Sequence, residues 1–110
     1  MTNGIRLDTI KDVKVIKSTP QFNKWLNGLR DPRARAKVNV RLRRLQTGAY
    51  GDCEPVGEGI SELRIFYGPG YRVYFIERFG EFVLLLAGGN KSTQDKDIKL
   101  AKKLANNFEG

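Results

Sequence analysis

The chain has 110 residues, which is enough for one domain with its own core and too few for a second one. Twenty basic residues against twelve acidic ones give a net charge of +8, which points to a polyanionic partner: RNA, DNA, an acidic protein or anionic lipid. The absence of histidine and the single cysteine, Cys53, exclude a histidine base, an internal disulfide and a cysteine-rich zinc site.

The sequence also predicts the setting in which the protein works. It contains no run of roughly 18 or more apolar residues, and its N-terminus lacks a signal-peptide core. We therefore expect a single cytoplasmic domain over residues 1–110, with no membrane partner, no metal and no cofactor. Residues 1–11 show no strong period, and we expect them to form a flexible arm or a leader to the first strand.

A short strand and a helix are predicted next. Residues 12–17 alternate apolar and polar side chains, as a strand at an edge of the sheet or beside the later strands would do. Ser18 or Thr19 can cap the helix, and Pro20 suits its first turn, where a missing N–H costs nothing. The apolar stripe of this helix comprises Phe22, Trp25, Leu26 and Leu29.

A second helix is predicted from Asp31-Pro32 to about Thr47, with an apolar face made of Ala34, Val38, Leu42 and Leu45. The rest of this helix is strongly basic, and Asp31 is its single acid. A solvated surface is the alternative interpretation, but ordinary surface helices mix charges, so we predict a phosphate-binding face. Its candidate RNA- or ribosome-binding residues are Arg33, Arg35, Lys37, Arg41, Arg43 and Arg44.

The second half of the chain predicts an antiparallel meander of three strands, interrupted at Gly68-Pro69-Gly70 and at Gly80-Glu81. Ser92 or Thr93 is predicted to cap a terminal helix that reaches about Phe108. The expected strands are residues 60–67, 71–79 and 82–88, with a further short strand near 52–56. Together the elements predict an α+β fold: a small antiparallel sheet, mixed at most at the N-terminal strand, with two N-terminal helices and one C-terminal helix.

Two arginines interrupt the apolar pattern of the first two meander strands. If Gly68-Pro69-Gly70 forms the whole loop, Phe66 faces Arg72 and Arg64 faces Tyr74, so both guanidinium groups share one face of the sheet. Two arginines without an adjacent acid on one concave sheet face resemble a phosphate clamp, since each can bind phosphate oxygens bidentately.

The alternative interpretation is that Arg64 pairs with Glu62 or Glu77, while Arg72 covers apolar surface with its stem. Lys91 leaves the end of the third meander strand and can approach the same face. Cleavage of RNA without a metal uses the ribose 2′-hydroxyl as the nucleophile, so the protein must orient it, remove its proton and stabilise the charged phosphorane. Arginines supply the electrostatic part, and a lysine crowded by arginines can act as base or acid.

The strings ELR, YGPGYRVYF and GGNKSTQDKDI, at residues 62–64, 67–75 and 88–98, resemble those of the RelE/HigB toxins. They are most similar to the branch called phage-derived addiction-module killer proteins, and the likeness runs from about Val13 to Phe108. The resemblance implies a RelE-like microbial RNase fold and a toxin of a type II toxin–antitoxin pair that cuts mRNA in the ribosomal A site. It also implies two partners, the ribosome and a helix-turn-helix antitoxin.

By position, the resemblance implies catalytic roles for Arg64, Arg72 and Lys91, with Arg72 as the phosphate-contacting arginine of the strand. Some relatives place a tyrosine or histidine near the C-terminus as base or acid, but here no tyrosine follows Tyr74 and histidine is absent. Lys91 is therefore the preferred base or acid. The candidate helpers are Tyr67, Tyr71, Tyr74, Ser92 and Gln94.

Two other functions stay open on the sequence. A ParE-like toxin on the same scaffold would poison DNA gyrase by binding it and would cleave nothing. A non-catalytic RNA- or ribosome-binding module would need the basic helix but no charged strand face beside it. The cluster of Arg64, Arg72 and Lys91 is the feature that separates the nuclease from these alternatives.

Overall fold

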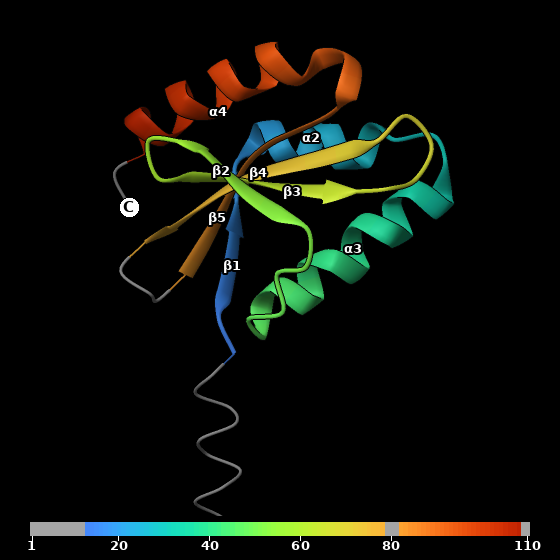
Figure 1. Cartoon of the computed structure of the whole chain (residues 1–110), viewed down its shortest axis with the longest axis horizontal. Helices are drawn as coiled ribbons and strands as arrows, with labels where there is room; N and C mark the ends of the chain where they lie inside the picture. Colours follow the sequence, from blue (N-terminus) through green and yellow to red (C-terminus); the bar gives the residue numbers. More distant parts are fainter. Residues whose placement is uncertain (1–12, 79–81, 109–110) are drawn as a thin grey trace, which may run out of the picture.

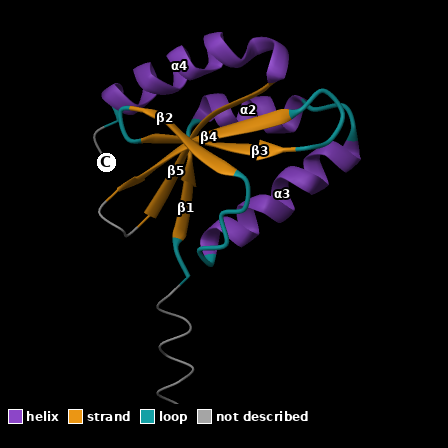
Figure 2. Cartoon of the chain, viewed as in Figure 1, coloured by secondary structure: helices purple, strands orange, loops and turns teal. Residues whose placement is uncertain are grey.

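The computed structural model describes residues 13–78 and 82–108, in which five strands form one sheet in the order β1-β5-β4-β3-β2 (Figures 1 and 2). The strands are β1 (Val15–Ser18), β2 (Cys53–Gly57), β3 (Ile60–Ile65), β4 (Tyr71–Arg78) and β5 (Phe82–Asn90). The helices are α2 (Pro20–Gly28), α3 (Pro32–Gln46) and α4 (Gln94–Asn107), with a 3₁₀ turn, η1 (Lys91–Thr93), before α4. The predicted α+β class is confirmed. The predicted arm and the Gly80-Glu81 turn lie outside the described residues.

The sheet is mixed only at β1, as predicted. This strand lies at one edge and pairs in parallel with β5, whereas β2, β3, β4 and β5 pair antiparallel. Its paired residues begin at Val15, later than the predicted 12–17. One reason is that the N–H of Lys14 is donated to the carbonyl of Gln46, at the end of α3, instead of to a neighbouring strand.

The first two helices begin where the sequence predicts. The hydroxyl of Thr19 accepts a hydrogen bond from the N–H of Phe22 (3.0 Å) and donates one to the carbonyl of Leu86 (2.7 Å), which fixes the start of α2 to β5. Asp31 accepts from the N–H of Arg33 (2.9 Å) and caps α3. In both helices the proline that follows the cap occupies the first turn.

Thr93, one of the two predicted caps, is the N-cap residue of α4, but its side chain makes no capping hydrogen bond. Its hydroxyl lies 2.5 Å from the Asp97 carboxylate. The 3₁₀ turn η1, which the sequence did not predict, precedes α4 and has its own cap, Asn90. The side-chain oxygen of Asn90 accepts hydrogen bonds from both the N–H (2.9 Å) and the hydroxyl (2.6 Å) of Ser92.

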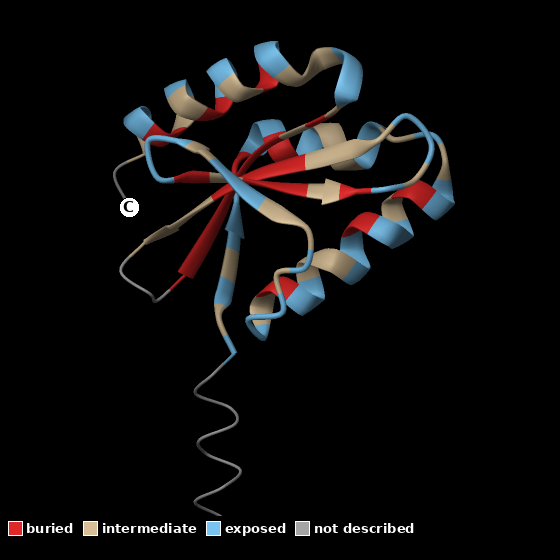
Figure 3. Ribbon diagram, in the orientation of Figure 1, coloured by how far each residue is buried: buried red, intermediate tan, exposed pale blue. Residues whose placement is uncertain are grey.

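Helices cover both faces of the sheet, so the domain has two cores. In Figure 1, α4 lies on one side of the strands and α3 on the other, and in Figure 3 the buried residues of α4 turn toward the sheet. The core under α2 and α3 comprises Phe22, Val38, Leu45, Leu63, Ile65, Val73, Phe75, Val83 and Leu85. The core under α4 comprises Ile60, Tyr74, Phe82, Leu84, Leu86, Ala87, Ala101 and Ala105. No helix among the described residues is long and apolar enough to cross a bilayer.

Candidate nucleic-acid interface

Arg64 and Arg72 lie directly opposite each other on β3 and β4, and Gly89 of β5 continues the same row. The predicted sharing of one face is confirmed, because opposed residues of an antiparallel pair point the same way. The predicted partners are wrong by two residues: Arg64 does not face Tyr74, and Phe66 does not face Arg72. The reason is a wider loop than predicted. β3 ends at Ile65, and the turn closes through a hydrogen bond from the N–H of Gly70 to the carbonyl of Tyr67 (3.1 Å).

Two carboxylates at the β2 edge of the sheet hold Arg64 in place. Its Nη2 lies 2.9 Å from Asp52 and 3.0 Å from Glu54, and its Nε also donates to Asp52 (3.2 Å). The hydrogen bond to Asp52 is the main cause that raises the pKa of Arg64. These side chains stay partly open to water, with 25% of Arg64, 32% of Asp52 and 62% of Glu54 exposed. The predicted absence of an adjacent acid is therefore wrong.

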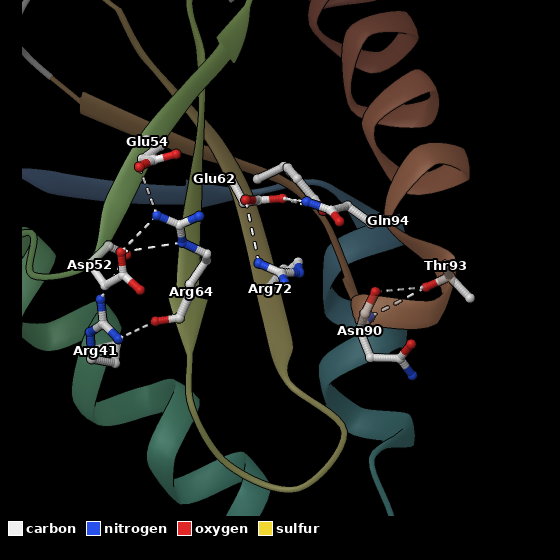
Figure 4. A network of polar contacts seen from close by, with 10 residues as sticks. Arg41, Asp52, Glu54, Glu62, Arg64, Arg72, Asn90, Thr93 and Gln94 are labelled. Atoms are coloured by element: carbon white, nitrogen blue, oxygen red, sulfur yellow. Dashed lines mark hydrogen bonds and ion pairs between the residues drawn. The ribbon is translucent and has the colours of Figure 1, made fainter.

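Arg72 belongs to a buried network around Glu62 (Figure 4). Its Nη1 lies 3.4 Å from the Glu62 carboxylate, and the two side chains are 12% and 3% exposed. The same carboxylate accepts hydrogen bonds from Gln94 (2.7 Å) and from the hydroxyl of Tyr74 (3.0 Å). Burial, followed by the bond to Glu62, raises the pKa of Tyr74. Arg72 thus forms a structural ion pair with Glu62 in this conformation. Its Nε is buried and has no hydrogen-bond partner among the described residues.

Lys91 lies at the same end of the sheet and is exposed. It directly follows β5, and its Cβ lies 3.7 Å from where a side chain on Gly70, in the β3–β4 turn, would begin. Two glycines set this junction: a Cβ on Gly88 would lie 2.2 Å from the Trp25 ring, and one on Gly89 would lie 1.7 Å from the Asp97 carboxylate. Both positions therefore exclude any larger residue, which explains the Gly-Gly of the motif physically.

The candidate helpers do not form one group. Tyr67 donates its hydroxyl to Asp31 (2.7 Å), a bond that raises the pKa of Tyr67 and lowers that of Asp31. Tyr71 packs against Trp25 on the opposite face, with ring centroids 6.3 Å apart. Tyr74 and Gln94 bind Glu62, as described above, and Ser92 donates hydrogen bonds to Asn90. Among the described residues, no group of three or more histidine, cysteine, aspartate or glutamate side chains is placed to hold a metal ion.

The basic residues of α3 divide into two kinds. Arg35 donates to the carbonyl of Leu29, and Arg41 donates to the carbonyls of Arg64, Tyr50 and Asp52, so both are occupied in holding the fold together. Burial also lowers the pKa of Arg41. The remaining candidates are exposed to solvent: Arg33, Lys37, Arg43 and Arg44. Within the described part of the chain, none of these four makes an ion pair.

Sequence reasoning did not connect Asp52 and Glu54 with Arg64, assigned Glu62 to the wrong arginine and placed Phe66 in a strand. Asp52 and Glu54 lie ten or more residues before Arg64, so no local spacing linked them to it. Glu62 lies two residues from Arg64 and on the same face, and that alternation was the available signal for its position. Phe66 was placed in the strand, whereas 83% of its surface is exposed in the turn.

Comparison with known proteins identifies relatives over most of this structure. Residues 24–106, from within α2 to the last turn of α4, match the family described as phage derived protein Gp49-like (DUF891). An uncharacterized protein of Haemophilus influenzae is 57% identical over 90 residues, which cover 82% of this chain and 91% of the relative. The family match includes every residue of the two arginine networks and of the Lys91 junction.

Proposed function

Because the chain belongs to the Gp49-like family of phage-derived proteins, which are related to the RelE-type toxins, we propose that it is the toxin of a type II toxin–antitoxin pair. In this proposal it acts as a ribosome-dependent endonuclease on mRNA in the A site. Cleavage needs no metal and uses the ribose 2′-hydroxyl as its nucleophile. The observation that carries the proposal is the family match across the strands that hold Arg64 and Arg72 and the turn that holds Lys91.

Of the three cations assigned to cleavage, Arg64 and Lys91 are the two that the RNA backbone can reach. The ion pairs of Arg64 are partly exposed, and water and salt screen exposed pairs, so a phosphate can replace the carboxylates. A phosphate also matches the fork of a guanidinium group and carries more charge than a carboxylate. Arg64 would then stabilise the phosphorane, and Lys91 would move the proton as base or acid.

Arg72 takes a different role in this scheme from the one that the resemblance implies. Its contact with Glu62 is nearly dry, so an RNA phosphate would have to break a buried ion pair to bind it directly. We assign Arg72 as a positioning residue, which fixes Glu62 and, through Gln94, the start of α4 beside Lys91. The exposed cations of α3 would contact the RNA of the translating ribosome, and a helix-turn-helix antitoxin would cover the same charged surfaces.

The test replaces the two exposed cations by a residue that keeps the aliphatic stem. Arg64→Met and Lys91→Met should each lower translation-dependent mRNA cleavage by about 10²–10³-fold, the usual loss when one charge-stabilising group is removed. Cleavage would be measured by mapping mRNA ends after induction, and folding by circular dichroism. Lys99→Met, on the exposed side of α4, is the matched control and should cleave like the parent chain. Normal cleavage by both site variants would overturn the assignment.

A gyrase-poisoning toxin is the second candidate, and one observation favours it. The carboxylates of Asp52, Glu54 and Glu62 neutralise the two strand arginines, which a protein that only binds a partner can tolerate. The same induction experiment separates the two functions. Gyrase-linked DNA breaks with intact mRNA would support the second candidate, whereas translation-dependent mRNA ends without DNA breaks would support the first.

A further inference from the structure

Phe66 is the most exposed large apolar side chain of the described residues, with 83% of its surface open to solvent. It lies beside a hollow of about 310 Å³ between α3 and the end of β3, and Ala36, Val40 and Ile65 form the rest of its apolar lining. We name this hollow the Phe66 groove. Phe66 belongs to neither core of the domain, and with its apolar neighbours at the hollow it forms a patch, which indicates an interaction site where a single exposed residue would not.

The Phe66 groove is lined by cations as well as by apolar atoms. Lys37, Arg41 and Arg44 complete its lining, and no acidic residue contributes to it. Arg41 is occupied by backbone carbonyls, whereas Lys37 and Arg44 are exposed and make no ion pair in the described part of the chain. The Lys37 ammonium lies 5.3 Å from the centre of the Tyr67 ring, at the side of the hollow. The occupant must therefore combine an apolar surface with negative charge.

We propose that the Phe66 groove binds an unpaired nucleotide of single-stranded RNA, with the base stacked on Phe66 and the adjacent phosphates on Lys37 and Arg44. An aromatic ring beside a row of cations is the combination that proteins use to bind single strands, because every base offers a stacking face. A base pair inside a duplex does not offer that face. A nucleotide supplies the flat apolar surface and the anion in one small unit, whereas an acidic peptide needs separate side chains for each.

This inference rests on RNA as the substrate of the proposed function, and it adds a binding subsite outside the residues assigned to cleavage. Arg64 and Lys91 act on the backbone at the α4 side of the sheet, whereas the Phe66 groove lies on the α3 side, at the end of β3. β3 ends at Ile65, one residue after Arg64, so a single strand of RNA can pass around this end of the sheet from the α4 side to the α3 side.

The test measures the affinity of the full chain for a labelled single-stranded RNA of roughly 12 nucleotides by fluorescence anisotropy. Phe66→Ala should weaken binding by about 5–150-fold, the range for losing one stacked base, and Phe66→Trp should retain it. Phe66→Ala should leave the salt dependence unchanged, whereas Lys37→Met with Arg44→Met should flatten the plot of log K against log salt by about 0.7 for each lost phosphate contact. Leu100→Ala, which truncates another exposed apolar side chain on α4, is the control and should bind normally.

The outcomes that overturn the inference are distinct. Absence of RNA binding by the parent chain, unchanged binding by Phe66→Ala, or failure of Phe66→Trp to retain binding would each do so. An acidic peptide that loses affinity for Phe66→Ala while RNA does not would identify a protein partner instead. The proposed function can fail separately. A chain that binds RNA through Phe66 but cuts no mRNA would support the Phe66 groove and contradict the nuclease.

Discussion

Arg64 and Arg72 oppose each other across β3 and β4, and each is neutralised by a different set of carboxylates. Like charges directly opposite in a sheet repel, so this pairing needs compensation to be stable. Arg64 takes its compensation from Asp52 and Glu54 at the surface, and Arg72 takes it from buried Glu62. The two guanidinium groups therefore differ in their access to a ligand. A ligand can replace the exposed carboxylates around Arg64, whereas the buried carboxylate keeps Arg72 in its ion pair.

The exposed carboxylates should limit RNA binding at Arg64. We expect the double variant Asp52→Asn, Glu54→Gln to bind single-stranded RNA more tightly, on the order of tenfold at low salt, because two competing negative charges are removed. The gain should shrink as the salt concentration rises. Glu58→Gln, at another exposed acid that pairs with Lys102, removes one negative charge and so gives the effect of net charge for each acid removed. A gain in the double variant no larger than two such single-charge effects would mean that Arg64 does not contact RNA.

The buried pair of Arg72 and Glu62 should affect the stability of the fold rather than the affinity for RNA. Glu62→Gln should cost about 3–5 kcal/mol of unfolding free energy, because it leaves the charge of Arg72 buried without a partner. Removing both charges, with Arg72→Met and Glu62→Gln together, should cost less than Glu62→Gln alone. Urea unfolding of the single and double variants measures the coupling between them. If the costs simply add, the two side chains do not form the pair described here.

The glycines before Lys91 should tolerate no side chain. Gly89→Ala places a Cβ 1.7 Å from the Asp97 carboxylate and should destabilise the fold by about 1–3 kcal/mol, the usual cost of overpacking. Gly28→Ala is the matched control, since no atom lies within 4 Å of its Cβ and the residue ends α2. In the control, we expect unchanged or slightly raised stability. Thermal unfolding distinguishes the two variants. Equal melting temperatures for Gly89→Ala and Gly28→Ala would contradict the close approach of Gly89 to Asp97.

The hydrogen bond from Tyr67 to Asp31 should make stability depend on pH at both ends of the range. The bond lowers the pKa of Asp31, so its contribution is present above the ordinary aspartate value of 3.8 and is lost as the pH falls through the lowered pKa. It also raises the pKa of Tyr67, so the contribution is lost as the pH rises above 10 through the raised value.

Tyr67→Phe tests this linkage. The parent chain should be more stable than the variant between these limits, and the difference should vanish beyond them. Urea midpoints measured from acid to alkaline pH give the comparison. Tyr71→Phe is the control, because the hydroxyl of Tyr71 makes no hydrogen bond within the described residues. A difference that stays constant over the whole range would exclude the linkage.

Local sequence was sufficient for the helix starts and for the sorting of strand faces. Thr19 with Pro20, and Asp31 with Pro32, satisfy the first N–H groups of a helix from within a few residues, so their effect can be predicted without knowing the fold. The alternation of β3 and β4 placed Arg64 and Arg72 on one face because a shift of one residue would bury an arginine. A shift of two residues keeps every side chain on its face, and local pattern cannot detect it.

The tertiary structure alone decided that register and the partners of the two arginines. The β3–β4 turn is wider than its glycines suggest, and the chain around Asp52 is placed by long-range contacts with Arg41 and Arg64. Contacts between distant segments follow from packing and charge compensation across the whole domain, and no spacing in the sequence encodes them. The chain by itself therefore determined which residues carry charge on this sheet face, and only folding decided which of those charges a ligand can reach.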